Sequence, residues 1–170
     1  MALSKLEFRA MGSPCAIRIY AQNAALATAA MYAAATEINR LEQKYSRFKH
    51  DNFFAHVNTA AAMGGSIEID DETASLLNYA ATCFEQSDGL FDITSGSLRK
   101  LWNFNTSNDA RPKIPTRAEI ATALDAVGWH HVSWTNQRLR FAKQNMEIDF
   151  GGIVKEYAAD CAATICRQHD

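Results

Sequence analysis

Apolar and polar residues alternate in several short stretches of the chain, and each such stretch predicts a β-strand with one buried face. The turn-forming residues 11–14 separate two of these stretches and predict a β-hairpin. Asn136-Gln137 separates another two and predicts a second hairpin. The predicted strands cover residues 6–10, 15–20, 66–69, 131–135 and 138–142.

Apolar residues spaced three and four positions apart predict helices between these strands. Capping residues mark two of the helix starts, and glycines mark two of the ends. The predicted helices run over residues 24–44, from Asp70 or Asp71 to Asp88-Gly89, and from the capping box at residues 116–119 to Val127-Gly128.

Two stretches lack a clear period. Residues 46–63 are expected to form a long loop with a helical turn, and such loops in compact domains are usually functional or mobile. Residues 105–115 are polar and are predicted to form a mobile surface loop.

Residues 146–150 predict one more strand, which a turn at Gly151-Gly152 connects to a last helix. Free N–H groups in the first turn of a helix attract anions, and glycines let a ligand approach the backbone. Lys155 lies in that first turn, where the helix dipole disfavours a cation unless an anion binds beside it. The segment is therefore a candidate phosphate site next to Asp149. The alternative is a structural turn with Lys155 in water.

Together these elements predict an α+β fold in which a mixed, largely antiparallel sheet packs with helices. With 170 residues, 48% of them hydrophobic, one domain over residues 1–170 is expected to bury a core. The net charge of −2 gives no electrostatic reason to expect a nucleic-acid partner. Because no apolar run is long enough for a transmembrane segment or a signal peptide, we expect a cytoplasmic protein.

Two polar clusters allow both a structural and a functional interpretation. Asp92 precedes Thr94 and Ser95 in a strand-to-helix turn, so it is either a cap or part of a polar clamp for a planar ligand, with Phe91 beside it. Residues 11–13 (Met-Gly-Ser) form either an ordinary hairpin turn or a site where a flat ligand meets a thioether and bare backbone.

Four blocks of sequence, in order along the chain, resemble the signature motifs of the FAD:protein FMN transferases, the ApbE family. Residues 11–13 are similar to the family's Met-Gly-Thr, and residues 46–48 with Asn58 to its Ser-x-Tyr followed by asparagine. Residues 89–96, continuing to 101–104, are similar to G-x-F-D-I-T-x-G…L-W-x-F. Residues 149–160 are similar to D-[LF]-G-G-I-A-K-G-Y-A-x-D.

The resemblance implies an ApbE-like α-β roll and a Mg²⁺-dependent reaction. In that reaction FAD is cleaved at its pyrophosphate, AMP leaves, and FMN is esterified to a Ser or Thr hydroxyl of a target flavoprotein. Some members instead hydrolyse FAD to FMN and AMP. By position, the resemblance implies that the backbone oxygen of Gly152 contributes to the metal. It also implies FAD contacts at Met11, Phe48, Leu90, Phe91, Asp92, Asp149 and Lys155.

The chain departs from the family pattern in three ways. Glu156 replaces a glycine and could crowd a phosphate, and Phe48 replaces a tyrosine and so lacks its hydroxyl. Family members are usually about twice as long, and their second half supplies the other metal ligands and the histidine implicated in chemistry, so no catalytic residue is assigned here. We therefore expect a fragment, a truncated product or half of a split protein. The alternatives are a non-enzymatic flavin-binding module, dimeric or completed by a C-terminal polypeptide, and an FAD pyrophosphatase.

Overall fold

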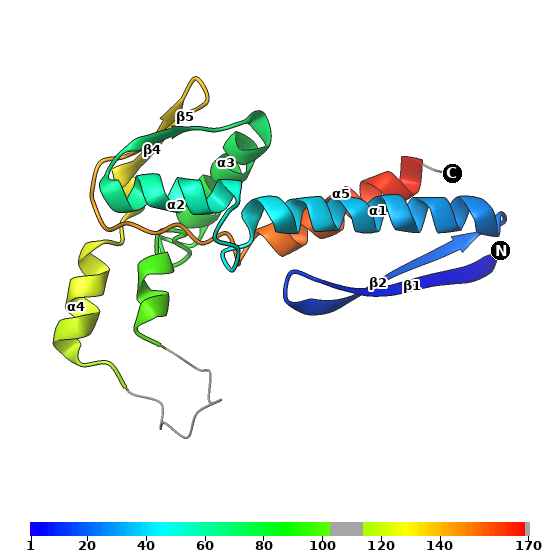
Figure 1. The fold of residues 1–170 in the computed structure, drawn as a ribbon, viewed down its shortest axis with the longest axis horizontal. Helices are drawn as coiled ribbons and strands as arrows, with labels where there is room; N and C mark the ends of the chain where they lie inside the picture. Colours follow the sequence, from blue (N-terminus) through cyan, green and yellow to red (C-terminus); the bar gives the residue numbers. More distant parts are fainter. Residues whose placement is uncertain (103–113, 169–170) are drawn as a thin grey trace. The chain divides into compact units, whose positions relative to one another are not determined.

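The computed structural model describes residues 1–102 and 114–168. The chain divides into two compact units, unit 1 with Met1–Phe54 and Gly151–Asp170 and unit 2 with Ala55–Phe150 (Figure 1). Each unit contains an antiparallel sheet, which confirms the predicted α+β class. Most of the predicted surface loop at residues 105–115 lies outside the described residues. Within the described ranges, no helix combines the length and apolar character needed to cross a membrane.

Unit 1 begins with the predicted N-terminal hairpin. Its strands, β1 (Ala2–Ala10) and β2 (Ser13–Ala21), pair antiparallel along their whole length. The two loop residues, Met11 and Gly12, have φ angles of 52° and 71°. Both angles lie in the left-handed region that a two-residue type I′ turn requires. The loop that carries the first signature block is therefore a tight two-residue turn.

Two long helices complete unit 1. The first, α1 (Ala24–Tyr45), starts at Asn23, whose side-chain oxygen accepts hydrogen bonds from two backbone N–H groups of the first turn. It packs against α5 (Val154–Gln168) and against both strands of the hairpin, and Figure 1 shows the two helices side by side. The predicted apolar stripe of α1 is confirmed by its buried residues, Ala27, Ala30, Met31, Ala34, Ala35, Ile38, Leu41 and Tyr45.

Unit 2 contains a three-stranded sheet of order β3-β5-β4 with short helices around it. The predicted hairpin turn at Asn136 and Gln137 is confirmed, and both residues have positive φ. The strands and helices are β3 (Ser66–Glu68), α3 (Asp71–Gln86), the 3-10 helix η1 (Gly96–Lys100), α4 (Arg117–Asp125), the 3-10 helix η2 (Trp129–His131), β4 (Val132–Thr135) and β5 (Arg138–Phe141).

The helix starts of unit 2 follow the predicted capping signals. The Asp70 carboxylate caps α3 by accepting a hydrogen bond from the N–H of Thr73 at 3.0 Å. Thr116 and Glu119 form the complete capping box of α4, each side chain bonded to the backbone of the other residue. Such caps satisfy N–H groups that the first turn of a helix leaves without a partner.

The prediction of a loop over residues 46–63 is wrong for its second half, where the helix α2 (Phe53–Met63) forms. Its buried side chains are Phe54, Val57 and Ala61, at helical spacing. This stripe covers only two turns and polar residues interrupt it, so the local period is weak. Burial against the rest of the fold, rather than local propensity, stabilises such a short helix.

The predicted strand at residues 146–150 is extended, but among the described residues it joins no sheet. Its one strand-like pairing is an isolated parallel bridge between Glu147 and Ser95. The predicted buried face is nevertheless correct, because Met146, Ile148 and Phe150 are all buried. The backbone of this segment bonds to a side chain and to a loop instead of a strand ladder.

Candidate functional site

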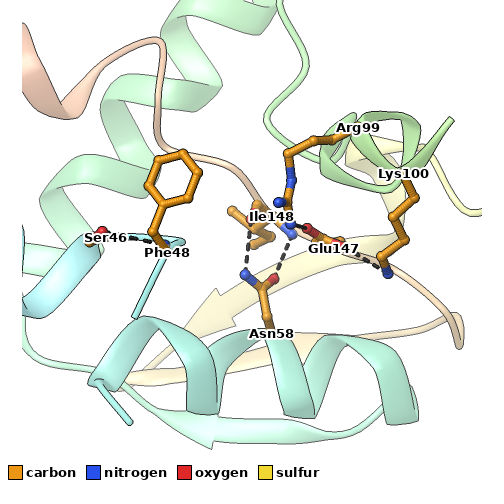
Figure 2. A network of polar contacts seen from close by, with 7 residues as sticks. All are labelled: Ser46, Phe48, Asn58, Arg99, Lys100, Glu147 and Ile148. Carbon is orange, nitrogen blue, oxygen red and sulfur yellow. Dashed lines mark hydrogen bonds and ion pairs between the residues drawn. The ribbon is translucent and has the colours of Figure 1, made fainter. Parts of the chain in front are cut away.

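A side-chain amide on α2 holds the extended segment 146–150 in unit 2 (Figure 2). Asn58 Oδ1 accepts a hydrogen bond from the N–H of Ile148 at 2.7 Å, and Asn58 Nδ2 donates one to the carbonyl of Ile148 at 3.1 Å. One side chain thus satisfies both backbone polar groups of a residue 90 positions away. In a sheet, a neighbouring strand would satisfy these groups.

The same segment also bonds to the loop that follows α3. The N–H of Asp149 donates a hydrogen bond to the carbonyl of Ile93 at 2.8 Å. Gly96 approaches so closely that a Cβ at this position would lie 2.7 Å from the carbonyl oxygen of Glu147. Two of the signature blocks, residues 89–96 and the block that begins at Asp149, are therefore joined within unit 2.

Asp92 organises the loop of residues 89–96 through both of its carboxylate oxygens. Oδ1 accepts hydrogen bonds from the backbone N–H and the hydroxyl of Thr94, each at 2.7 Å, and Oδ2 accepts one from the N–H of Trp129 at 3.2 Å. The Thr94 hydroxyl in turn accepts a hydrogen bond from the N–H of Gly128 at 2.8 Å. Asp92 thus forms a side-chain turn with Thr94 rather than a cap on η1.

Leu90 and Phe91 differ in exposure although they are adjacent. The Leu90 side chain is 91% exposed, which is unusual for a large apolar residue. Phe91 is half-buried, and its N–H donates a hydrogen bond to the Ser87 hydroxyl at 2.8 Å. The loop therefore presents apolar surface to solvent beside the polar Asp92 turn, as a planar ligand would require.

Two cations from η1 hold the carboxylate of Glu147. Arg99 Nη2 lies 2.6 Å from Oε1, and Lys100 Nζ lies 2.8 Å from Oε2 (Figure 2). Burial of Glu147 would by itself raise the pKa of its carboxyl group, but the hydrogen bonds and charges of Arg99 and Lys100 outweigh burial and lower this pKa below its ordinary value. Glu147 is thus an ionised anchor between η1 and segment 146–150.

In unit 1, the hairpin turn meets the start of α5. The Lys155 ammonium donates a hydrogen bond to the Ser13 hydroxyl at 3.3 Å, across a sequence separation of 142 residues. Lys155 is exposed and lies in the first turn of α5, where the helix dipole disfavours a positive charge. The first and last signature blocks are therefore in contact.

A groove of about 640 Å³ runs between the hairpin and α5 in unit 1. Met11, Ser13 and Lys155 line it, together with many apolar side chains of β2 and α5. Arg18 and Arg167 also line it, and among the described residues that do so there is no Asp or Glu. The groove is thus apolar in composition and positive in charge. Its volume falls in the range of small-molecule sites.

Phe48 and Gly152, the remaining predicted site residues, are both exposed and both belong to unit 1. The Phe48 ring is 69% exposed, and its N–H donates a hydrogen bond to the Ser46 hydroxyl at 3.3 Å (Figure 2). The Arg47 guanidinium lies 5.0 Å from the centre of this ring. Gly152 lies in the turn before α5.

The predicted site residues are distributed over both units. Met11, Phe48, Gly152 and Lys155 belong to unit 1, whereas Leu90, Phe91, Asp92 and Asp149 belong to unit 2. Sequence reasoning missed the Glu147 anchor and the role of Asn58. Their partners lie 48 and 90 positions away, so no local pattern could identify them. The position of Asn58 in a family motif was the one available signal.

In the part of the chain that the structure describes, no group of three or more His, Cys, Asp or Glu side chains could hold a metal ion. The predicted magnesium contact at Gly152 is a single backbone oxygen. Mg²⁺ requires near-octahedral oxygen coordination, usually with one or two carboxylates. The described residues thus do not enclose Mg²⁺ in a cluster of three or more His, Cys, Asp or Glu side chains.

Comparison with known proteins shows which family the sequence resembles. The sequence model described as the ApbE family matches residues 11–170. The FAD:protein FMN transferase of Treponema pallidum is 27% identical over 170 residues, which cover 94% of this chain and 45% of that protein. The corresponding protein of Chlamydia pneumoniae is 26% identical over 130 residues, covering 75% of this chain and 40% of that protein.

Solved structures share the fold. The ApbE protein of Thermotoga maritima is 30% identical with a TM-score of 0.86, covering 99% of this chain and 54% of that one. The flavin transferase ApbE of Vibrio cholerae has the same TM-score at 19% identity and covers 99% of this chain and 54% of that one; this match shows the fold alone. The chain thus spans about half the length of the relatives it matches.

Replacing Gly96 with alanine tests the close approach of η1 to segment 146–150. The added Cβ would meet the backbone of Glu147, so we expect Gly96→Ala to lower the free energy of unfolding by about 1–3 kcal/mol. Gly65→Ala is the matched control, because its Cβ would have its nearest neighbour at an ordinary 3.6 Å. Urea denaturation measures the free energy of unfolding of both variants. Equal stability of the two variants would contradict the contact.

Acid titration tests the Glu147 anchor. Since the pKa of Glu147 is lowered by folding, its contribution to stability is complete above the pKa of the unfolded side chain, about 4.3. The contribution is lost as the pH falls through the lower pKa of the folded state. The difference in unfolding free energy between the wild type and Glu147→Gln should therefore shrink during acidification below about pH 4.

The control for this titration is Glu68→Gln, an exposed glutamate on β3 of the same unit. Its difference from the wild type should remain small at every pH, because exposed charges contribute little to stability. A Glu147→Gln difference that stays constant from pH 7 to pH 3 would mean that the ion pairs with Arg99 and Lys100 do not stabilise the fold.

Proposed function

The chain belongs to the ApbE family, and from this membership we propose that it supplies the FAD-binding part of an FAD:protein FMN transferase. One observation carries the proposal: the last signature block contacts two of the other three blocks, which lie far from it in the sequence. Ser13 meets Lys155 in unit 1, and Ile93 meets Asp149 in unit 2. That the two units act as one domain stays a prediction.

The proposed reaction is a phosphoryl transfer. The oxygen of a Ser or Thr hydroxyl on a target flavoprotein forms a bond to the FMN phosphorus of FAD, and the hydroxyl proton is released. The bond from that phosphorus to the bridging oxygen of the pyrophosphate breaks, and AMP leaves with the bridging oxygen. Atoms and charge balance without any oxidant or reductant.

The residues of unit 1 offer the chemistry that a pyrophosphate requires. Lys155 and the N–H groups at the start of α5 would stabilise the negative charge of the diphosphate. Arg18 and Arg167 add positive charge to the same groove. Anion binding would also relieve the unfavourable interaction between the Lys155 cation and the α5 dipole.

The exposed apolar side chains suit the flat rings of FAD. Phe48 and Leu90 expose large apolar surfaces, and Met11 lines the groove with a polarisable thioether. Phe48 can stack on a ring but cannot donate the hydrogen bond of the family tyrosine. Asp92 and Asp149 stay predicted FAD contacts through their carboxylates.

Magnesium dependence stays a prediction of family membership. No step of the reaction is assigned to the metal. If Gly152 contributes a backbone oxygen, carboxylates, waters and substrate phosphates would complete the coordination of the metal.

We further propose that turnover requires a complementing polypeptide. The relatives are about twice the length of this chain. Among the described residues, β1 and β2 pair only with each other, and two-stranded sheets are marginally stable alone. Exposed residues of the hairpin, such as Leu3 and Tyr20, offer a surface that further strands would cover. A second copy of the chain is the alternative occupant.

Binding of FAD tests the proposed contacts. We expect Lys155→Ala and Asp149→Ala each to weaken FAD binding by about 1–3 kcal/mol, roughly 5- to 150-fold in Kd, if each side chain makes a charge-assisted contact. Isothermal titration calorimetry measures the affinity. Lys5→Ala and Asp125→Ala are the matched controls, because they remove the same charges from surface ion pairs in the same two units. Unchanged affinity in both test variants would leave only a structural turn.

Transfer of FMN tests the activity. The protein is incubated with FAD, Mg²⁺ and a flavoprotein domain that carries the acceptor hydroxyl, with and without the C-terminal half of the Thermotoga maritima relative. We expect FMN ester, detected by mass spectrometry, chiefly in the complemented reaction. Efficient transfer by this chain alone would contradict the need for a complement, and no transfer under either condition would contradict the proposed activity. Release of FMN and AMP without an acceptor would instead indicate a pyrophosphatase.

A further inference from the structure

The backbone of segment 146–150 is held by side chains and a loop rather than by a sheet. Ile148 is 1% exposed, and its N–H and carbonyl both bond to the amide of Asn58. A buried backbone group without a partner is strongly unfavourable. Asn58 therefore takes the place of a missing neighbouring strand.

The two hydrogen bonds also fix which way the segment faces. A side-chain amide has an acceptor oxygen on one side and a donor NH₂ on the other, and these meet the N–H and the carbonyl of Ile148 in only one orientation of the amide. Because residues alternate along an extended chain, burial of Ile148 directs Glu147 and Asp149 to the opposite side. Holding Ile148 thus determines the direction of the Asp149 side chain.

Two further contacts limit the remaining freedom of the segment. The carboxylate of Glu147 is held by Arg99 and Lys100 from η1, and the N–H of Asp149 bonds to the carbonyl of Ile93. Asp149 therefore follows a residue, Ile148, that Asn58 holds in place, and its own N–H is bonded to Ile93. Asn58 is the one member of this set that comes from α2.

We propose that Asn58 is a positioning residue, which holds the backbone of Ile148 so that the Asp149 carboxylate faces FAD. This inference rests on the proposed function, because it concerns the direction of a predicted FAD contact. Asn58 itself need not touch the ligand. Its effect on FAD binding should pass entirely through Asp149.

Substitution of Asn58 separates positioning from general stability. Asn58→Asp keeps the shape and the acceptor for the Ile148 N–H but places an oxygen against the Ile148 carbonyl, whereas Asn58→Leu removes both bonds. We expect hydrogen exchange at the amides of Ile148 and Asp149 to become about tenfold faster or more in Asn58→Leu. FAD affinity should fall about fivefold or more in both variants. Asn78→Asp is the matched control, since Asn78 is exposed on α3 of the same unit.

A double-mutant cycle with Asp149→Ala gives the readout that a purely structural role would not change. If Asn58 acts through Asp149, the Asn58 substitutions should cost little further FAD affinity once Asp149 is replaced. Additive losses would overturn the inference, and so would unchanged exchange at Ile148 and Asp149 in Asn58→Leu. Because Asn58→Asp preserves side-chain volume, it provides the test if Asn58→Leu does not fold.

The outcomes separate this inference from the proposed function. Failure of the wild type itself to bind FAD, alone and with the C-terminal half of a relative, would overturn the proposed function and with it the role of Asn58 in directing Asp149 to FAD. Binding by the wild type with no loss in either Asn58 variant would overturn the positioning role alone.

Discussion

The arrangement of unit 2 depends on one constraint: a buried extended backbone must find hydrogen-bond partners. Segment 146–150 buries the side chains of Met146, Ile148 and Phe150 and also that of Glu147, yet no strand of the described residues lies beside it. The Asn58 amide and the carbonyl of Ile93 supply the partners. These partners come from α2 and from the loop after α3. The hydrogen bonds that satisfy the backbone of segment 146–150 therefore also join that segment to α2 and to this loop. The packing of the core and the geometry of the candidate site therefore have the same cause.

The electrostatics of the segment follow from this packing. Fixing Ile148 places Glu147 against η1, where Arg99 and Lys100 compensate its burial. Gly96 permits this close approach because a side chain there would meet the Glu147 carbonyl. The loop of residues 89–96 is in turn ordered by Asp92, whose oxygens bond to Thr94 and Trp129. Asp92 thus has a demonstrated structural role, and any contact with FAD would be additional to it.

Local signals in the sequence predicted the elements whose causes are local. The hairpin turns at Met11-Gly12 and Asn136-Gln137, the caps at Asp70 and Thr116 and the long stripe of α1 all depend on neighbouring residues, and each is confirmed. The helix α2 and the unpaired state of segment 146–150 depend on distant partners, and both were predicted wrongly. The motif resemblance predicts FAD contacts at Asp92, Asp149 and Lys155, which stay predictions, and it could not reveal Glu147, whose cationic partners Arg99 and Lys100 lie outside the motifs.

The positive charges at the start of α5 and in the adjacent groove are expected to lower the stability of the protein when no ligand is bound. Lys155 lies where the α5 dipole is positive, and the described residues that line the adjacent groove add two arginines and no carboxylate. The dipole disfavours a cation at that position unless an anion is present, and among the described residues the ammonium has one hydrogen bond, to the Ser13 hydroxyl at 3.3 Å. Local features that oppose stability are expected where a ligand supplies the missing interaction. An anionic dinucleotide would supply it, since its phosphates interact favourably with both Lys155 and the free N–H groups of the helix. The same reasoning explains why Glu156 is tolerated beside it: a carboxylate in the first turn is favoured by the dipole and partly offsets the lysine when no anion is bound.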